Sequence, residues 1–226
     1  MGAARRGLAG CESRRKSPPL LGPAAAAPGL LWSRPVFIRG TPRPPSSQEH
    51  TLPIIIGYDA VTLREKVDLR AAGVRLDELG ELRSLSALNE KVALLRLTGR
   101  LDEAWDIANT ALRQARFTGS REELAASRIR RAQVQQFQGK LDEAAAELTH
   151  CVLESEAHEW AGVAAFAREN RGKVYFEQGE LERALADFTA AVFLREKAGA
   201  SSEHLESSLI AVAVVESFIA EQRQAG

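Results

Sequence analysis

A short block of residues recurs three times at a fixed interval, and it constrains the fold more than any other feature of the sequence. Each copy has a glycine, a leucine two positions later, an acidic residue next, and an alanine five positions after the glycine. The glycines are Gly99, Gly139 and Gly179, so the period is 40 residues. Self-similarity at such a period indicates stacked helix pairs, because one pair cannot bury its apolar face without neighbours.

The residue types in the block suit a sharp turn between two antiparallel helices. The glycine permits the tight turn, and the leucine packs into the hinge. Acidic residues at the start of the second helix are favoured by the helix dipole. The alanines let the two helices approach closely. Small residues that keep this register are Ala104, Ala144 and Ala184, followed by Ala111, Cys151 and Ala191.

At these positions the sequence resembles the tetratricopeptide repeat family, over about residues 82–222. The third repeat matches the family motif best, with Gly172, Tyr175, Gly179, Ala184, Phe188 and Ala191. The usual repeat has 34 residues, so a period of 40 is similar to the lengthened repeats of kinesin-light-chain-like and bacterial regulatory members. Two features depart from the pattern. Arginines stand at 128, 131, 168 and 171, where the family prefers apolar residues, and no proline ends a repeat.

The repeat and the helical spacing of apolar residues predict an all-α, right-handed helical-repeat superhelix, or α-solenoid, with three helix pairs and a C-terminal capping helix. The repeats are expected at about 82–119, 122–159 and 162–199. The expected helices span 61–72, 77–98, 102–117, 121–138, 142–157, 160–178, 182–198 and 202–222. Gly73, Gly119 and Gly199 are expected to end helices.

The last helix is expected to cover the open face of the third repeat, because repeat arrays need such a cap. Its predicted apolar stripe is Leu205, Leu209, Val212, Val215, Phe218 and Ile219. The alternative is that it forms a dimer contact, so the expected state is a monomer or a weak homodimer.

Residues 1–57 differ in composition from residues 58–226, which form the predicted repeat domain. All nine prolines lie in the first segment, the last being Pro53, and proline disrupts both helix and sheet. The segment is therefore predicted to be disordered. Two alternatives stay open. Its arginines are typical of a transit segment, and it would also arise from a start placed upstream of a true one near Val61, since Met1 is the only methionine.

Composition gives no indication of nucleic acid, membrane or cofactor binding. The chain has 30 basic and 30 acidic residues, and no apolar run approaches the length of a membrane span. Two cysteines do not make a disulfide framework, which favours a reducing, cytoplasmic location. There is no phosphate-binding glycine loop. The chain is therefore not expected to be an enzyme.

One helix carries side chains with the spacing of metal ligands. His150, Glu154 and His158 are four residues apart and share a face. The favoured interpretation is a surface face beside Cys151, which occupies a small buried repeat position, so no metal site is predicted.

Basic residues recur at equivalent repeat positions. Lys91, Arg131 and Arg171 form one such set, and Arg128 and Arg168 form another. The favoured interpretation is internal pairing of Arg131 and Arg171 with Glu147 and Asp187. The alternative is a groove that recognises an acidic peptide.

The resemblance implies a protein-interaction adaptor that holds a peptide or helix of a protein partner on its concave face, formed by the first helix of each repeat. Predicted contact residues are Asn89, Arg96, Ile129, Gln133, Gln136, Glu169, Lys173 and Phe176. A carboxylate clamp for chaperone tails is not predicted, because Ala93, Gln133 and Lys173 stand at the clamp's asparagine position. The alternative function is a regulatory or sensory module that acts in trans on a transcription factor or kinase.

Overall fold

The computed structural model describes residues 53–59 and 61–225. These residues belong to the second of the chain's two units, residues 49–226. The predictions of disorder, a transit segment or a misplaced start concern residues that lie almost wholly outside this description. In chain order the elements are β1 (Ile55–Tyr58), β2 (Glu65–Val67), α1 (Leu69–Leu79), α2 (Leu85–Leu97), α3 (Leu101–Thr118), α4 (Arg121–Phe137), α5 (Leu141–Ala157), α6 (Ala161–Glu177), α7 (Leu181–Lys197) and α8 (Ser202–Ala225).

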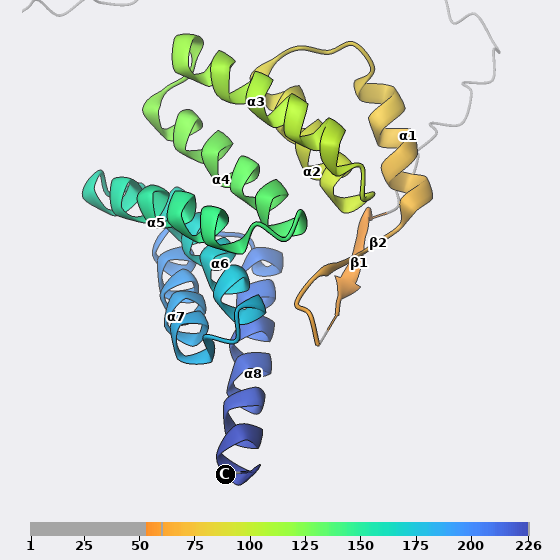
Figure 1. Cartoon of the computed structure of the whole chain (residues 1–226). Helices are drawn as coiled ribbons and strands as arrows, with labels where there is room; N and C mark the ends of the chain where they lie inside the picture. Colours follow the sequence, from red (N-terminus) through yellow and green to blue (C-terminus); the bar gives the residue numbers. More distant parts are fainter. Residues whose placement is uncertain (1–52, 60, 226) are drawn as a thin grey trace, which may run out of the picture. The chain divides into compact units, whose positions relative to one another are not determined.

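The predicted all-α helical-repeat architecture is confirmed. Helices α2 and α3, α4 and α5, and α6 and α7 form three successive antiparallel pairs that stack on one another (Figure 1). Helices α3 to α7 begin and end within one residue of their predicted bounds. The repeat therefore fixes the middle of the fold closely.

Each turn inside a repeat is closed by a glycine in the left-handed region. The φ angles of Gly99, Gly139 and Gly179 are 78°, 76° and 77°. The residue after the glycine donates its N–H to a carbonyl in the preceding helix, as Lys140 does to Gln135 at 2.9 Å. This bond satisfies a carbonyl at the helix end that has no partner within the helix. The next helix begins directly after the turn.

Small residues in the second helices allow the close approach of the helix pairs. Ala104, Ala144 and Ala184 are fully buried. In the third repeat the first helix also supplies a small residue, Gly172 of α6, where an added Cβ would lie 2.9 Å from the ring of Phe188. Phe188 is itself fully buried. The aromatic ring therefore occupies space that only a glycine on the facing helix leaves free.

The N-terminal end of the unit differs from the prediction. The prediction of a helix at 61–72 is wrong, because β1 and β2 pair there as antiparallel strands and the helix α1 begins only at Leu69. Three consecutive isoleucines followed by Gly57-Tyr58-Asp59 favour a strand and a turn over a helix. Helix α1 starts one residue after Asp68, whose carboxylate accepts the N–H groups of Arg70 and Ala71.

The single helix predicted at 77–98 is also wrong. Gly80, with φ of 38°, ends α1, and the hydroxyl of Ser84 accepts the N–H of Ala87 to start α2. The apolar spacing that predicts a single helix therefore covers two helices, and Ser84 is the N-cap residue of the second one. Gly73 does not end a helix, since it lies within α1.

Helix α8 packs on the last repeat with most of its predicted stripe: Val215 and Ile219 are buried, and Val212 and Phe218 pack, partly buried, against the same cluster. The buried residues are Ser208, Ala211, Val215 and Ile219, spaced by three and four. Leu209 is half exposed, on the other side of the helix. None of the helices in the described ranges is long and apolar enough to cross a membrane.

Candidate functional site

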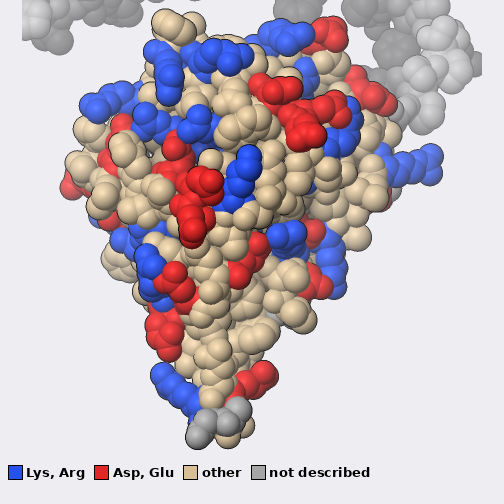
Figure 2. Space-filling view, in the orientation of Figure 1, with Lys and Arg blue, Asp and Glu red and all other residues tan. Residues whose placement is uncertain are grey.

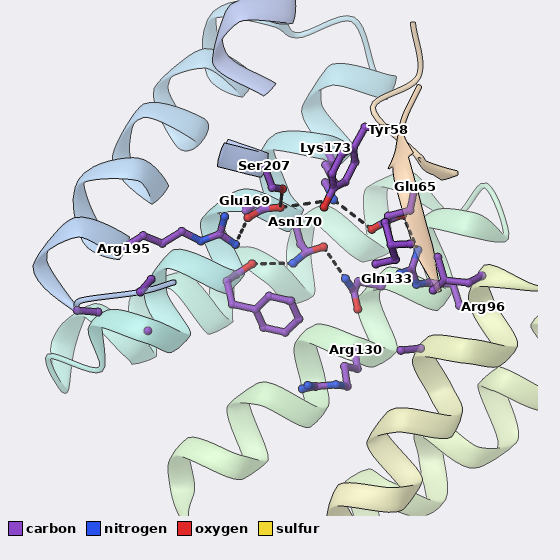
Figure 3. A pocket seen from close by; sticks show the side chains of 17 residues that line it. Tyr58, Glu65, Arg96, Arg130, Gln133, Glu169, Asn170, Lys173, Arg195 and Ser207 are labelled. Atoms are coloured by element: carbon purple, nitrogen blue, oxygen red, sulfur yellow. Dashed lines mark hydrogen bonds and ion pairs between the residues drawn. The ribbon is translucent and has the colours of Figure 1, made fainter. Parts of the chain in front are cut away.

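The first helices of the three repeats, together with the hairpin and the α7–α8 junction, line a cavity of about 580 Å³. We call it the first-helix cavity (Figure 3). Residues 93, 133 and 173, which are one period apart, all line it. The repeat therefore brings equivalent positions of α2, α4 and α6 to one site, as the sequence pattern requires of stacked pairs.

A row of alternating charges crosses this cavity. Arg96 of α2 binds the carboxylate of Glu65 at 3.2 Å, and Lys173 of α6 binds the same carboxylate at 3.3 Å. Lys173 also lies 3.5 Å from Glu169, which pairs with Arg195 of α7. Figure 3 shows these contacts as one continuous chain from α2 to α7. The row links the first repeat to the third through the hairpin.

The charges in this row are held away from water. The side chains of Arg96 and Glu169 are 5% and 7% exposed, and that of Glu65 is 10% exposed. Burial of Glu65 favours its neutral form, but the charges of Lys173 and Arg96 outweigh burial and lower its pKa to about 2. Burial of Lys173 opposes its charge, yet Glu65 and Glu169 raise its pKa. Glu65 and Lys173 therefore form a strong mutual pair.

Polar groups on α4, α6 and α8 complete the cavity wall. The amide of Gln133 donates to the side-chain oxygen of Asn170 at 2.7 Å, and Asn170 donates to the carbonyl of Phe166 at 2.7 Å. Ser207 and Ser208 of α8 each donate to Glu169 at 3.4 Å. These bonds satisfy buried polar atoms that would otherwise be costly to bury.

Arg130 is the exception among the cavity's charges. Within the described ranges no carboxylate pairs with it, and its guanidinium donates a 3.4 Å bond to the carbonyl of Ala126. Its guanidinium lies 5.3 Å from the centre of the Phe166 ring, and burial lowers its pKa. Figure 3 shows it apart from the chain of dashed contacts. Four cations against two carboxylates leave the cavity with a surplus of two positive charges.

A second ionic contact lies beside the cavity. Arg64 of the hairpin holds Glu177 of α6 with two nitrogens, at 3.1 and 3.2 Å, and Gln136 of α4 donates to the same carboxylate at 2.9 Å. The guanidinium groups of Arg64 and Arg96 lie 4.6 and 4.4 Å from the ring centre of Phe137. The hairpin is thus held by planar cations stacked on an aromatic ring as well as by ion pairs.

The structure distributes the eight predicted contact residues among three environments. Ile129 is fully buried in the core of the second repeat. Asn89 contacts Ser127, and Phe176 packs edge-to-face on Phe218 of α8 at 5.3 Å. Those that line the cavity are Arg96, Gln133, Glu169 and Lys173, and Gln136 lies beside it. The site thus gathers the polar members of the set except Asn89, while the apolar ones pack against other parts of the fold.

Sequence reasoning missed Glu65, Arg130 and Arg195. Glu65 lies before the repeats, so the period gives no indication of its position. Arg130 is next to Arg131 of the recognised basic set, and a helix turns by about 100° per residue. Neighbouring arginines therefore face different sides of α4. The isoleucine run before Gly57 is the one signal that would have placed a strand near Glu65.

The recurrent basic residues predicted to pair internally do so. Arg131 binds Glu147 at 3.0 Å and Arg171 binds Asp187 at 2.7 Å. Arg168 binds the same Asp187 at 2.8 Å. Lys91 donates to the carbonyls of Gly80 and Leu82. The arginines join the two helices of a repeat, and Lys91 joins α2 to the loop before it, so these cations do not form a peptide groove. Figure 2 accordingly shows basic and acidic side chains interspersed over the visible face.

The helix of His150 and Cys151 forms ordinary structural contacts. The Cys151 thiol is fully buried and lies 3.9 Å from the carbonyl of Ala125, and burial raises its pKa to about 12. Glu154 pairs with Arg128 at 3.0 Å, and His158 stacks on Trp160. Two of the residues with metal-like spacing therefore make other contacts: Glu154 forms an ion pair and His158 stacks on a ring.

Comparisons with known proteins support the repeat fold. No family model matches the chain, and no curated protein matches it. The crystal structure of the apo form of RapI is similar, with a TM-score of 0.52 and 17% identity over 69% of this chain and 57% of that one. BtubC (BKLC) from P. vanneervenii aligns with a TM-score of 0.49 and 17% identity, over 69% of this chain and 66% of that one. The chain thus spans little more than half of RapI. The fold is a tetratricopeptide-like helical repeat.

Proposed function

We propose that this protein is a non-enzymatic interaction scaffold whose first-helix cavity binds a carboxylate-bearing segment of a protein partner. The observation that carries the proposal is Arg130, a cation held in a cavity without a carboxylate partner in the described ranges. A partly buried cation without a counter-charge costs free energy, and a ligand carboxylate removes that cost.

The size and lining of the cavity suit a short peptide segment. A volume of about 580 Å³ falls within the range of ligand pockets. Apolar side chains, among them Leu97 and Phe166, stand beside the charged ones. An acidic side chain flanked by aliphatic groups would complement both features. Arg130 on α4 would contact the carboxylate, while Lys173 and Arg96 would add to the positive potential.

The cavity's own carboxylates do not favour catalysis. Glu65 has a pKa of about 2 and is bound by two cations, which makes it a poor general base. Glu169 is held by Lys173, by Arg195 and by two serines. Both carboxylates are thus committed to structural pairing, which supports a binding role.

A peptide selection tests this proposal. A phage-displayed random peptide library would be selected on the full chain, on Arg130→Gln and on Arg113→Gln, a matched control with an exposed arginine on α3. We expect the parent and the control to enrich acidic peptides and Arg130→Gln to lose that enrichment. Equal enrichment by all three proteins, or no preference for acidic peptides, would contradict the proposal.

A further inference from the structure

The chain's own hairpin lies against the face where the repeat array is expected to hold a partner. Three successive hairpin residues, Leu63, Arg64 and Glu65, make contacts with different parts of the repeat array. Leu63, which is 3% exposed, belongs to the apolar cluster of α6, α7 and α8 that contains Tyr175. Arg64 binds Glu177, and Glu65 bridges Arg96 and Lys173. A segment of this kind contacts the repeats as a bound peptide would.

Side-chain anchors hold the hairpin more than its backbone does. Its strands have four and three residues, and the pairing is irregular between Ile55 and Gly57. An isolated two-stranded hairpin is only marginally stable. Leu63 adopts a φ of 55°, which is unfavourable for leucine and persists only where the surroundings enforce it. The conformation therefore depends on burial of Leu63 and on the ion pairs of Glu65.

Departure of the hairpin would leave the first-helix cavity strongly basic. Arg96 would lose the carboxylate of Glu65, and Lys173 would keep Glu169, which is shared with Arg195. Arg130 has no carboxylate in the described ranges even with the hairpin in place. Unpaired cations in a half-buried site are costly. An incoming segment would therefore have to supply a carboxylate where Glu65 lies now.

We propose that the hairpin is an internal competitor for the partner, and that the partner segment displaces it by presenting the same anchors, a leucine and a glutamate two residues later. This inference rests on the proposed function and adds to it the partner's chemistry and its regulation. Binding then depends on the fraction of molecules with the hairpin released, so weakening the anchors should raise the apparent affinity.

The experiment uses the full chain and a fluorescent peptide with the sequence of residues 54–68. Its affinity, measured by anisotropy, is compared between the parent and the double variant Leu63→Ala/Glu65→Gln. We expect binding about tenfold or more tighter to the double variant. The same peptide with Glu65→Gln should lose that gain. Lys66→Gln in the full chain is the matched control, since Lys66 is exposed on the hairpin and should leave the affinity unchanged.

A second measurement tests displacement on the parent chain, so the inference can still be judged if the double variant does not fold. Hydrogen exchange is followed on the parent chain with and without saturating peptide. Loss of protection at residues 55–67, with α4 and α6 unchanged, supports displacement. Unchanged protection at saturation, or a double variant that folds and binds both peptides no better than the parent, overturns the inference.

The two proposals fail in distinguishable ways. If the library selection yields acidic peptides that depend on Arg130 while the hairpin is never displaced, the internal-competitor inference is overturned and the proposed function stands. If neither the parent nor the double variant selects acidic peptides, both are overturned.

Discussion

The first helices of the repeats carry two sets of cations, and these are neutralised in different ways. Arg131 and Arg171 are bound by Glu147 and Asp187 on the second helix of their own repeat. Arg96 and Lys173 are bound by Glu65 on the hairpin.

The partners of the first set are part of the repeat itself and separate only when the repeat unfolds. The partner of the second set lies on a short element outside the repeats. Chemically similar cations on the same helices can therefore be structural or available for binding, depending on what supplies the counter-charge.

The largest effect is expected where a permanent pair is broken. Asp187 is 3% exposed and binds both Arg168 and Arg171. Asp187→Ala leaves Arg171 without a carboxylate and should lower the free energy of unfolding by about 3–5 kcal/mol. Glu182→Ala, an exposed acid on the same helix, should cost only a few tenths of a kcal/mol. Urea unfolding followed by circular dichroism gives both values. Equal, small losses would show that the pair is not structural.

A smaller, pH-dependent effect is expected at the hairpin. The pKa of Glu65 is lowered from 4.5 to about 2, so its stabilisation is complete above about pH 4.5 and is lost as the pH falls toward 2. The difference corresponds to about 3 kcal/mol. Unfolding of the parent and of Glu65→Gln should therefore be compared between pH 2 and 7. We expect the variant to be less stable at neutral pH and the two to converge in acid. Parallel curves would refute the role of Glu65.

The smallest effect is expected at Arg130. Its neighbour Arg131 is one of the cations paired within the repeat, so the two arginines can be compared directly. Arg130→Gln removes a stacking contact with Phe166 and also a desolvated charge. These contributions oppose each other, so stability should change by less than about 0.5 kcal/mol. Arg131→Gln breaks the pair with Glu147 and should cost about 1 kcal/mol. Thermal melts distinguish the two. A larger loss for Arg130→Gln would identify it as a structural cation.

The sequence predicts those parts of the fold that repeat. The turn glycines and the small residues after them recur at a fixed period, so the helices from α3 to α7 follow directly. The pairing of Arg131 with Glu147 could be predicted for the same reason, since both positions recur one repeat later as Arg171 and Asp187. Because stacked repeats have equivalent surroundings, residues one period apart make equivalent contacts.

The site could be predicted only in part, because the hairpin residues that complete it lie outside the repeat. Gln133 and Lys173 are equivalent positions, and the period brings them together. Glu65 and Leu63 belong to a hairpin whose strands are too short to show an alternating pattern. Their contacts with Lys173 and Tyr175 of α6 join residues more than 100 positions apart. Such pairing depends on the completed stack rather than on local sequence.

Native-state hydrogen exchange measured against denaturant tests most directly whether the hairpin is a removable element on a permanent stack. We predict that amides of β1 and β2 open with a free energy about 2 kcal/mol or more below that of α4 and α6, and with little denaturant dependence, because local opening exposes little surface. If the hairpin amides exchange with the same free energy and the same denaturant dependence as α4 and α6, the hairpin is a fixed part of the fold, and its role as a competitor is contradicted.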